Sequence, residues 1–160
     1  MHFRSLFFPA AILFAAGTVQ AAIENATLDA AYAAVEPRVI EWRRDLHQNP
    51  ELSNREFRTA KKVAEHLRAL KFDTVETGVA HTGVVGTLRG GKPGPVIALR
   101  ADMDALPVQE QTGLPFASSA RGEYMGKDVP VMHACGHDTH VAMLMGAAHI
   151  LAQHREDLAG

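Results

Sequence analysis

The chain has 160 residues, of which 47% are apolar and 21% are charged, and its formal net charge at pH 7 is −2. This composition is typical of a globular protein and excludes a disordered or collagen-like chain. The near-neutral charge gives no reason to expect binding to nucleic acid or to an anionic membrane. The single cysteine, Cys135, excludes an intrachain disulfide scaffold.

The first 21 residues have the pattern of a secretory signal peptide. A basic start at Arg4 precedes an apolar stretch over residues 6–17, and small residues follow it at positions suited to cleavage after Ala21. The apolar stretch is shorter than the roughly 20 residues that a bilayer-spanning helix needs. We therefore expect residues 1–21 to be removed, which leaves a secreted or periplasmic protein without membrane attachment. The alternative is an uncleaved anchor or a buried helix.

Two amphipathic helices are predicted in the first half of the mature chain. Apolar residues recur every three or four positions over residues 35–46, and an Asn-Pro pair ends this pattern. Pro37 either opens the helix in its first turn or kinks it. Ser53 and Glu56 have the spacing of a capping box, so a second helix is expected over residues 54–71.

The hydrophobic period then changes from that of helices to that of strands. Residues 73–77 and 84–88 alternate, whereas residues 95–99 form a continuous apolar run that is typical of a strand buried on both faces. A Gly-rich turn separates the last two segments. We therefore expect a hairpin between residues 84–89 and 96–99.

The remaining chain is predicted to contain a loop and a third helix. Small, polar and Gly residues dominate residues 112–127, and a helical face of small residues begins near Thr139. Helices beside a mainly hydrophobic sheet indicate a layered α/β fold. The mature chain, residues 22–160, is long enough for one domain.

The strongest chemical signal is a cluster of histidine, cysteine and aspartate over residues 133–140. Thiolates and imidazoles are good ligands for divalent transition metals. Cys135 and His137 can share a face of an extended segment, and Gly136 between them permits a tight backbone. Asp138 could cap the following helix or orient a ligating imidazole. Ordinary capping and core residues are one alternative, and a Cys135 nucleophile with a histidine base is another.

Two carboxylates follow directly after the apolar run. Asp102 and Asp104 are two residues apart and can point the same way. Like charges at the end of a strand repel each other unless a cation or a proton lies between them. An Asp-rich turn is the alternative interpretation of this pair. Together with Cys135 and His137, the pair favours a metal site.

Three segments together resemble one known family. They are residues 43–52, residues 99–107 and the His-Ala-Cys-Gly-His-Asp segment at residues 133–138. They are similar to the aminoacylase-like metallopeptidases and amidohydrolases, in the branch that contains hippurate hydrolases, indoleacetyl-amino-acid hydrolases and N-acetyl-diaminopimelate deacetylases. The resemblance covers residues 35–160.

The resemblance implies a three-layer α/β/α zinc-peptidase-like catalytic domain with two divalent metal ions, zinc or manganese. Cys135 and His137 match metal ligands of the family, and Asp104 matches an active-site residue that helps orient the metal centre. The segment that contains His47 and Glu51 is expected to be structural. Three further residues are candidates for holding the ligands in place from outside the coordination sphere: Asp102, Asp138 and His140.

Other parts of the family pattern have no match up to Gly160. In the family, a general-base Glu, further ligands and a lid and dimerisation domain come later in the sequence. We therefore expect residues 22–160 to be the N-terminal part of the catalytic domain, inactive by itself. The complete enzyme would cleave the amide bond of N-acyl amino acids or related small amides by metal-activated water, and it could be a homodimer.

Two other functions remain open from the sequence. A secreted accessory protein could hold a metal ion in a closed shell made by His133, Cys135, His137 and His140. A Cys-dependent hydrolase would be inhibited by iodoacetamide and indifferent to chelators.

Overall fold

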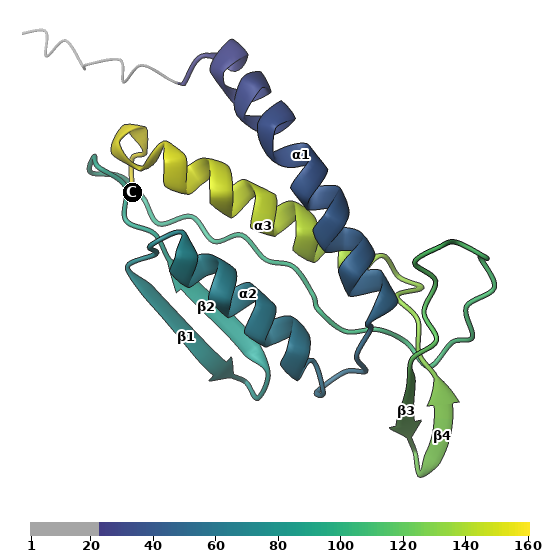
Figure 1. Ribbon diagram of the computed structural model, residues 1–160. Coiled ribbons are helices and arrows are strands. Elements are labelled where there is room, and N and C mark those ends of the chain that lie inside the picture. The colour runs from purple at the N-terminus through teal and green to yellow at the C-terminus, as the bar shows by residue number, and fades with distance from the viewer. Residues whose placement is uncertain (1–22) are drawn as a thin grey trace, which may run out of the picture.

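The computed structural model describes residues 23–160 (Figure 1). The predicted signal peptide at residues 1–21 lies outside this range. None of the helices in the described part of the chain is long and apolar enough to cross a membrane.

The described chain combines three long helices with two separate β-hairpins (Figure 1). β1 pairs antiparallel with β2, and β3 pairs antiparallel with β4. In chain order the elements are α1 (Asn25–Gln48), α2 (Phe57–Ala69), β1 (Thr74–Val79), β2 (Gly83–Thr87), β3 (Arg121–Tyr124), β4 (Lys127–Pro130), α3 (His137–Gln153) and the short 3-10 helix η1 (Arg155–Asp157).

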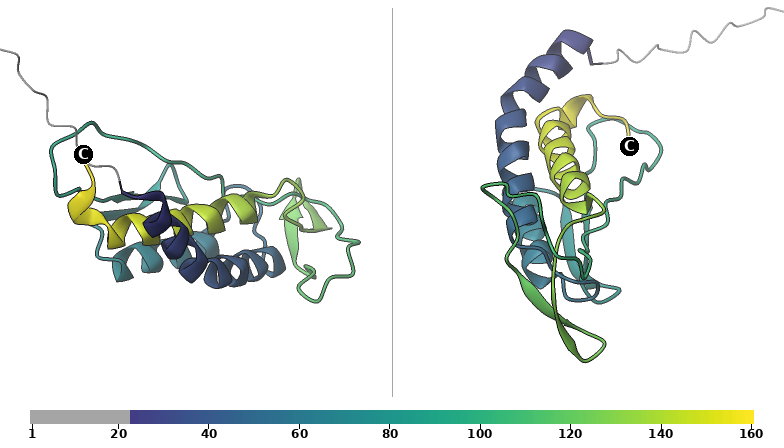
Figure 2. Two further views of the ribbon diagram at one scale, coloured as in Figure 1. Left: turned by 90° about the horizontal axis from the view of Figure 1, so that it is seen from above. Right: turned by 90° about the vertical axis from the view of Figure 1, so that its right-hand side faces the viewer.

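The main core lies where α1 packs along α3 (Figures 1 and 2). The predicted apolar face of α1 is confirmed, because its buried members meet buried residues of α3. Gly146 allows the two helices to approach closely, since a β-carbon there would lie 2.7 Å from Cγ2 of Val39. The buried core residues are Val35, Trp42, Leu46, Val141, Ala142 and Met145.

Helix α1 starts earlier than its apolar pattern predicts. Pro37 lies inside the helix and does not open it. Because proline has no backbone N–H, the hydrogen bond to the carbonyl of Ala33 cannot form there. The predicted end is confirmed, since the backbone N–H of Asn49 donates to the carbonyl of Asp45 over 3.2 Å.

Helix α2 is shorter than the predicted span of 54–71, and the predicted capping box is wrong. The carboxylate of Glu51 caps the helix instead, because it accepts from the backbone N–H groups of Arg58 over 2.9 Å and Thr59 over 2.8 Å. The carboxylate of Glu56 takes part in a tertiary contact instead of a capping box, since the hydroxyl of Thr82 donates to it over 2.6 Å. The structural role expected for Glu51 is therefore that of a helix cap.

Strands β1 and β2 confirm the alternating patterns at residues 73–77 and 84–88, but the predicted partner is wrong. β2 pairs with β1, and residues 96–99 belong to no strand. The buried strand expected at residues 95–99 is also wrong, since Val96 is 95% exposed and Ile97 is 75% exposed. In Figure 2 this segment runs as a bare trace along the outside of the fold. An apolar run becomes a buried strand only where a neighbouring strand and a covering layer exist.

The loop predicted at residues 112–127 contains part of a hairpin. β3 and β4 are joined by Met125 and Gly126, which both have positive φ, at 51° and 74°. Positive φ at both central residues is the geometry of a type I′ turn. Met-Gly lacks the Asn-Gly or Asp-Gly signal of such turns, which explains why the sequence pattern did not indicate it.

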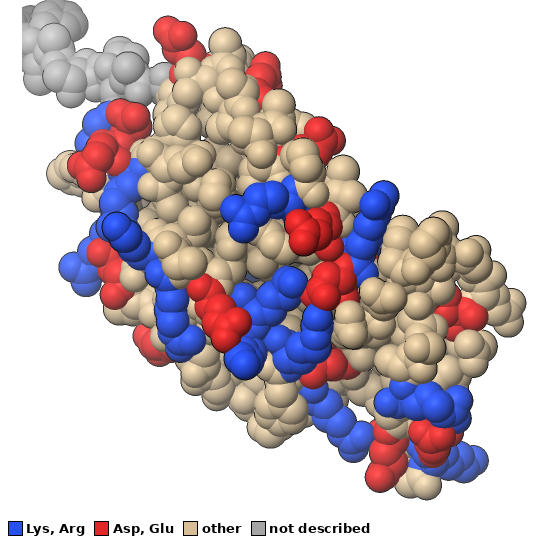
Figure 3. Space-filling view, in the orientation of Figure 1, with Lys and Arg blue, Asp and Glu red and all other residues tan. Residues whose placement is uncertain are grey.

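Charged side chains of both signs are interspersed on the face shown in Figure 3. Asp45 of α1 illustrates the pairing, because it lies 2.7 Å from Nη2 of Arg58 and 2.7 Å from Nζ of Lys62 on α2. These contacts join two helices that are adjacent in sequence. Partly exposed pairs of this kind add little stability each, so the fold depends mainly on its buried contacts.

We predict that Leu46→Ala lowers the free energy of unfolding by about 2–5 kcal/mol, because its side chain is fully buried between α1 and α3 and truncation leaves a cavity. Ile40→Ala, at a half-exposed position of the same helix, is the matched control and should cost about 1 kcal/mol or less. Urea denaturation measures both. Equal losses would show that the α1–α3 contact is not the core of the fold.

We also predict that Val96→Lys with Ile97→Lys reduces self-association without changing the melting temperature. An exposed apolar segment in extended conformation invites pairing with another chain, and charges suppress it. Met143→Lys, which alters an exposed apolar residue on α3, is the control. Light scattering and a thermal melt provide the readouts, and unchanged scattering of the double variant would contradict the prediction.

Candidate metal centre

Backbone hydrogen bonds place Asp104 beside the Cys/His segment. Leu106 and Met132 exchange two bonds, of 2.9 and 3.0 Å, and the N–H of Ala105 donates to the carbonyl of Glu51 over 2.7 Å. These bonds join three segments that are far apart in the sequence. The expected proximity of the 102–104 carboxylates to the metal-ligand segment therefore holds for Asp104.

The side chain of His137 is oriented by Asp104. Its Nδ1 lies 2.9 Å from the carbonyl oxygen and 3.1 Å from Oδ1 of Asp104. Both oxygens accept, so the neutral ring carries its proton on Nδ1 and keeps a lone pair on Nε2. A metal-ligating histidine commonly donates its other ring N–H to a carboxylate or a backbone carbonyl, and this hydrogen bond fixes the orientation of the ring. His137 is thus prepared to bind a cation through Nε2.

Cys135 and Gly136 lie just before α3. Cys135 is exposed, so its thiol is accessible to a cation and is not part of the apolar core. Gly136 is the N-cap residue, with φ 88° in the left-handed region, which confirms the expected need for glycine in this turn. α3 begins at His137, two residues before the predicted Thr139.

Asp138 does not cap the helix, in contrast to one of its two predicted roles, since no side chain of residues 23–160 bonds the N-terminal amides of α3. Its side chain is fully buried, and Oδ2 accepts from Nδ1 of His47 over 2.7 Å and forms an ion pair with Nε of Arg43 at 3.0 Å. Both partners belong to the last turns of α1. Asp138 therefore ties the N-terminus of α3 to the C-terminus of α1.

His47 was expected only to have a structural role. In the structure its ring lies between two carboxylates. Its Nε2 lies 3.0 Å from Oε1 of Glu110, so each ring nitrogen faces a carboxylate. Glu110 also accepts from the hydroxyl of Thr112 and the N–H of Ser118. Burial tends to raise the pKa of Glu110, but these hydrogen bonds and that of His47 lower it below its ordinary value. Glu110 is an isolated acid in a loop, and no sequence pattern indicated it.

His133 is buried, and neither of its ring nitrogens has a hydrogen-bond partner within residues 23–160. Oδ1 of Asp138 is likewise buried without a partner there. Burial lowers the pKa of His133, while the negative charge of Asp138 opposes this effect. The ring nitrogens of His133 and Oδ1 of Asp138 are therefore polar atoms to which a buried water molecule could hydrogen-bond.

The two remaining candidate residues have other neighbours. Oδ1 of Asp102 lies 2.5 Å from Nη2 of Arg100, and Asp102 therefore has a cationic partner of its own. The ring of His140 lies 5.8 Å from that of His137, centroid to centroid, on the exposed side of the first turn of α3. His140 is thus near the candidate ligand His137, whereas the recorded partner of Asp102 is Arg100.

Residues 23–160 do not by themselves assemble a complete metal-binding cluster. No group of three His, Cys, Asp or Glu side chains in this range could hold a metal ion. The donor set that fits a metal consists of the exposed thiol of Cys135 and the oriented imidazole of His137. Structural and catalytic zinc sites use three or four protein ligands, so this pair alone would not complete a site.

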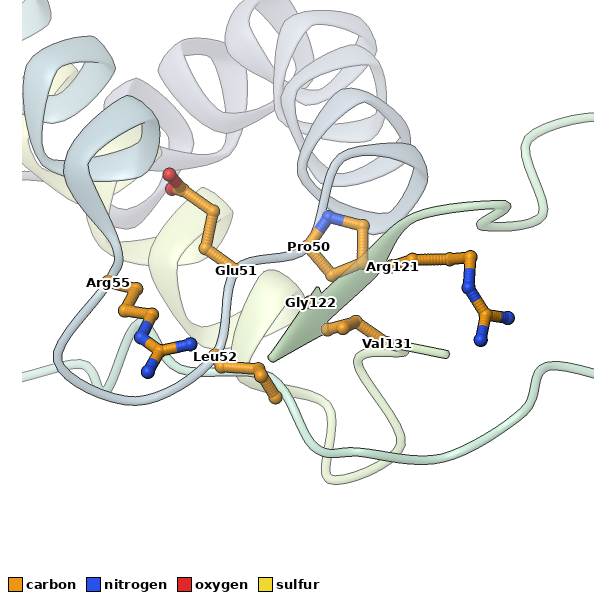
Figure 4. A pocket seen from close by; sticks show the side chains of 7 residues that line it. All are labelled: Pro50, Glu51, Leu52, Arg55, Arg121, Gly122 and Val131. Carbon is orange, nitrogen blue, oxygen red and sulfur yellow. The ribbon is translucent and has the colours of Figure 1, made fainter. Parts of the chain in front are cut away.

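Two shallow pockets lie beside the turn after α1. Figure 4 shows the first, in which the carboxylate of Glu51 points away from the hollow toward the helices. Neither Cys135 nor His137 lines it, so this pocket has no link to the candidate ligands. The second is lined partly by Asp104, Leu106 and Tyr124, and it therefore adjoins the candidate centre. The residues that line the pocket shown in Figure 4 are Pro50, Glu51, Leu52, Arg55, Arg121, Gly122 and Val131.

Comparison with known proteins gives a consistent result. Residues 98–160 match the model of peptidase family M20/M25/M40. The chain is 51% identical over 127 residues to thermostable carboxypeptidase 2 of Saccharolobus solfataricus, covering 79% of this chain and 30% of that relative. It is 48% identical over 127 residues to an N-acyl-L-amino acid amidohydrolase of Geobacillus stearothermophilus, covering 79% and 32%. Residues 98–160 of this chain are thus similar to peptidase family M20/M25/M40.

Solved M20 structures confirm the predicted fold class. The YxeP protein of Bacillus subtilis, described as a dinuclear metal binding peptidase from the M20 family, matches with a TM-score of 0.70 and 45% identity over 80% of this chain and 34% of its own. A protein of methicillin-resistant Staphylococcus aureus matches with a TM-score of 0.76 and 43% identity over 86% and 34%. The chain thus spans about a third of the length of the relatives that it matches.

We predict a pH-dependent contribution of Glu110 to stability. Because its pKa is lowered in the folded state, ionised Glu110 stabilises the fold above its ordinary pKa, and this contribution is lost as the pH falls through the folded pKa. Glu110→Gln should cost about 1–3 kcal/mol at neutral pH, and the cost should shrink below about pH 4. Urea denaturation across this range measures it. The exposed Glu65→Gln is the control, and a cost that does not change with pH would contradict the prediction.

Proposed function

We propose that this chain carries part of the active site of a metal-dependent amidohydrolase that cleaves the amide bond of N-acyl amino acids or related small amides. The observation that supports this most directly is the orientation of His137 by Asp104, which leaves Nε2 available two residues after the exposed thiol of Cys135. Relatives named N-acyl-L-amino acid amidohydrolase and N-acetylcysteine deacetylase support the substrate class.

The proposal assigns two divalent ions, zinc or manganese, to the complete enzyme. Such ions supply Lewis-acid polarisation of the substrate carbonyl and acidify a bound water. Cys135 and His137 would be ligands from this chain, and Asp104 would hold the ring of His137. Cys135 must lose its proton and His137 must remain neutral to bind, so metal affinity should fall with acid.

The same proposal covers location and partners. The signal pattern at residues 1–21 supports a secreted or periplasmic protein without membrane attachment after cleavage. A small-molecule substrate, and not nucleic acid, is the proposed partner. For a homodimeric complete enzyme, the family resemblance is the only support.

The metal assignment can be tested by titrating the chain with Co²⁺. Thiolate ligation by Cys135 should produce a charge-transfer absorption in the near ultraviolet, and Cys135→Ser should abolish it. His81→Ala, at an exposed position on the β1–β2 hairpin, should leave it unchanged. Two protein ligands predict weak binding. An unchanged spectrum for Cys135→Ser would contradict the assignment, and stoichiometric metal retained through dialysis would favour the accessory protein instead.

The catalytic assignment can be tested in a chimera. The 127-residue segment of the Geobacillus stearothermophilus relative that matches this chain is replaced by the corresponding segment of this chain. The chimera should hydrolyse N-acyl amino acids, and both a chelator and Cys135→Ser should abolish turnover. The 160-residue polypeptide alone should show negligible turnover. Turnover that resists chelators but not iodoacetamide would instead favour the Cys-dependent hydrolase.

A further inference from the structure

His47 has an unusual environment for a residue outside the candidate ligand set. Its side chain is buried at the end of α1, with Nδ1 2.7 Å from Asp138 and Nε2 3.0 Å from Glu110. A carboxylate oxygen can accept a hydrogen bond from a ring nitrogen, so the two contacts hold the ring at both of its nitrogens. An apolar residue could make neither contact.

The first contact controls where α3 begins. Asp138 follows His137 directly and lies in the first turn of α3. Its Oδ2 accepts from His47 and forms an ion pair with Arg43, and its side chain has no exposure to solvent. A buried charge requires its partners in place, because removing one partner leaves that charge uncompensated. The start of α3, and with it the backbone of His137, is therefore held against α1.

The second contact controls the chain that follows Asp104. Glu110 receives hydrogen bonds from the side chain of Thr112 and the backbone of Ser118 as well as from His47. The ring of Phe116 from the same loop packs edge-on against His47, with centroids 5.7 Å apart. His47 thereby joins the two segments that meet at the His137–Asp104 contact.

We propose that His47 is a positioning residue for the metal centre: its doubly hydrogen-bonded ring sets the place of α3 and of the loop after Asp104, and so the orientation of His137. This inference rests on the metal function proposed above. It adds to that function a residue that contacts neither the cation nor the substrate. Losing such a residue commonly lowers metal affinity about 10–100-fold.

The test uses the 160-residue chain, with His47→Gln as the variant and His66→Gln as the control. His66 lies in α2, and its Nε2 bonds the carbonyl of Met145, away from the ligand segment. Co²⁺ titration should show affinity lowered about 10–100-fold in His47→Gln and changed less than about threefold in His66→Gln. Thermal melts without metal show how much stability each variant loses.

A second readout does not need a metal ion. The ¹⁵N shifts of labelled histidine rings report which nitrogen of His137 carries the proton, with His137→Gln used for assignment. The wild-type chain should show the Nδ1-protonated form that Asp104 stabilises. His47→Gln should show a mixture of both forms, whereas His66→Gln should match the wild type. Because a general loss of stability does not alter this equilibrium, the readout separates positioning from folding.

A milder variant covers the case in which His47→Gln fails to fold. Glu110→Gln keeps an acceptor for His47 but removes the charge, and it should shift both readouts in the same direction by a smaller amount. The proposal is overturned if the tautomer of His137 is unchanged in the variant that folds. If wild-type chain shows no thiolate–Co²⁺ absorption, the metal function fails, and the tautomer of His137 alone decides about His47.

Discussion

The buried contact of Asp138 with His47 and Arg43 is the interaction on which the arrangement of this chain depends. It joins the C-terminal turn of α1 to the first turn of α3, whose apolar faces form the main core. A buried carboxylate is tolerated only when it is paired and hydrogen bonded, and losing one partner costs far more than the pair contributes over an apolar replacement. The contact therefore selects one relative placement of the two helices.

The same placement serves the candidate metal centre. Helix packing brings His137 to the segment around Asp104, where the Leu106–Met132 bonds complete the junction. Not every polar group at this end of the fold is paired, because both ring nitrogens of His133 and Oδ1 of Asp138 are buried without a partner within residues 23–160. Residues 96–99 are apolar and exposed, and they belong to no strand.

Local patterns predicted much of the secondary structure because they depend on neighbours in sequence. The apolar face around Trp42 and Leu46, the end of α1 and the alternation in β1 and β2 all follow from short-range rules. Prediction failed where a distant partner decides. Glu51 replaced the expected capping box, and the run at residues 95–99 has no adjacent strand. The turn at Met125 and Gly126 lacked its usual residue types.

The residue types and spacing of three segments, residues 43–52, 99–107 and 133–138, were sufficient to indicate the family resemblance and the candidate ligands, because ligand chemistry is a property of the side chains themselves. Only the tertiary structure decided that Asp104 orients His137, that Asp138 faces α1 and that His47 joins two carboxylates. These hydrogen bonds join residues that lie 33 to 91 positions apart in the sequence. Local sequence rules describe only near neighbours, so tertiary packing alone determines these contacts.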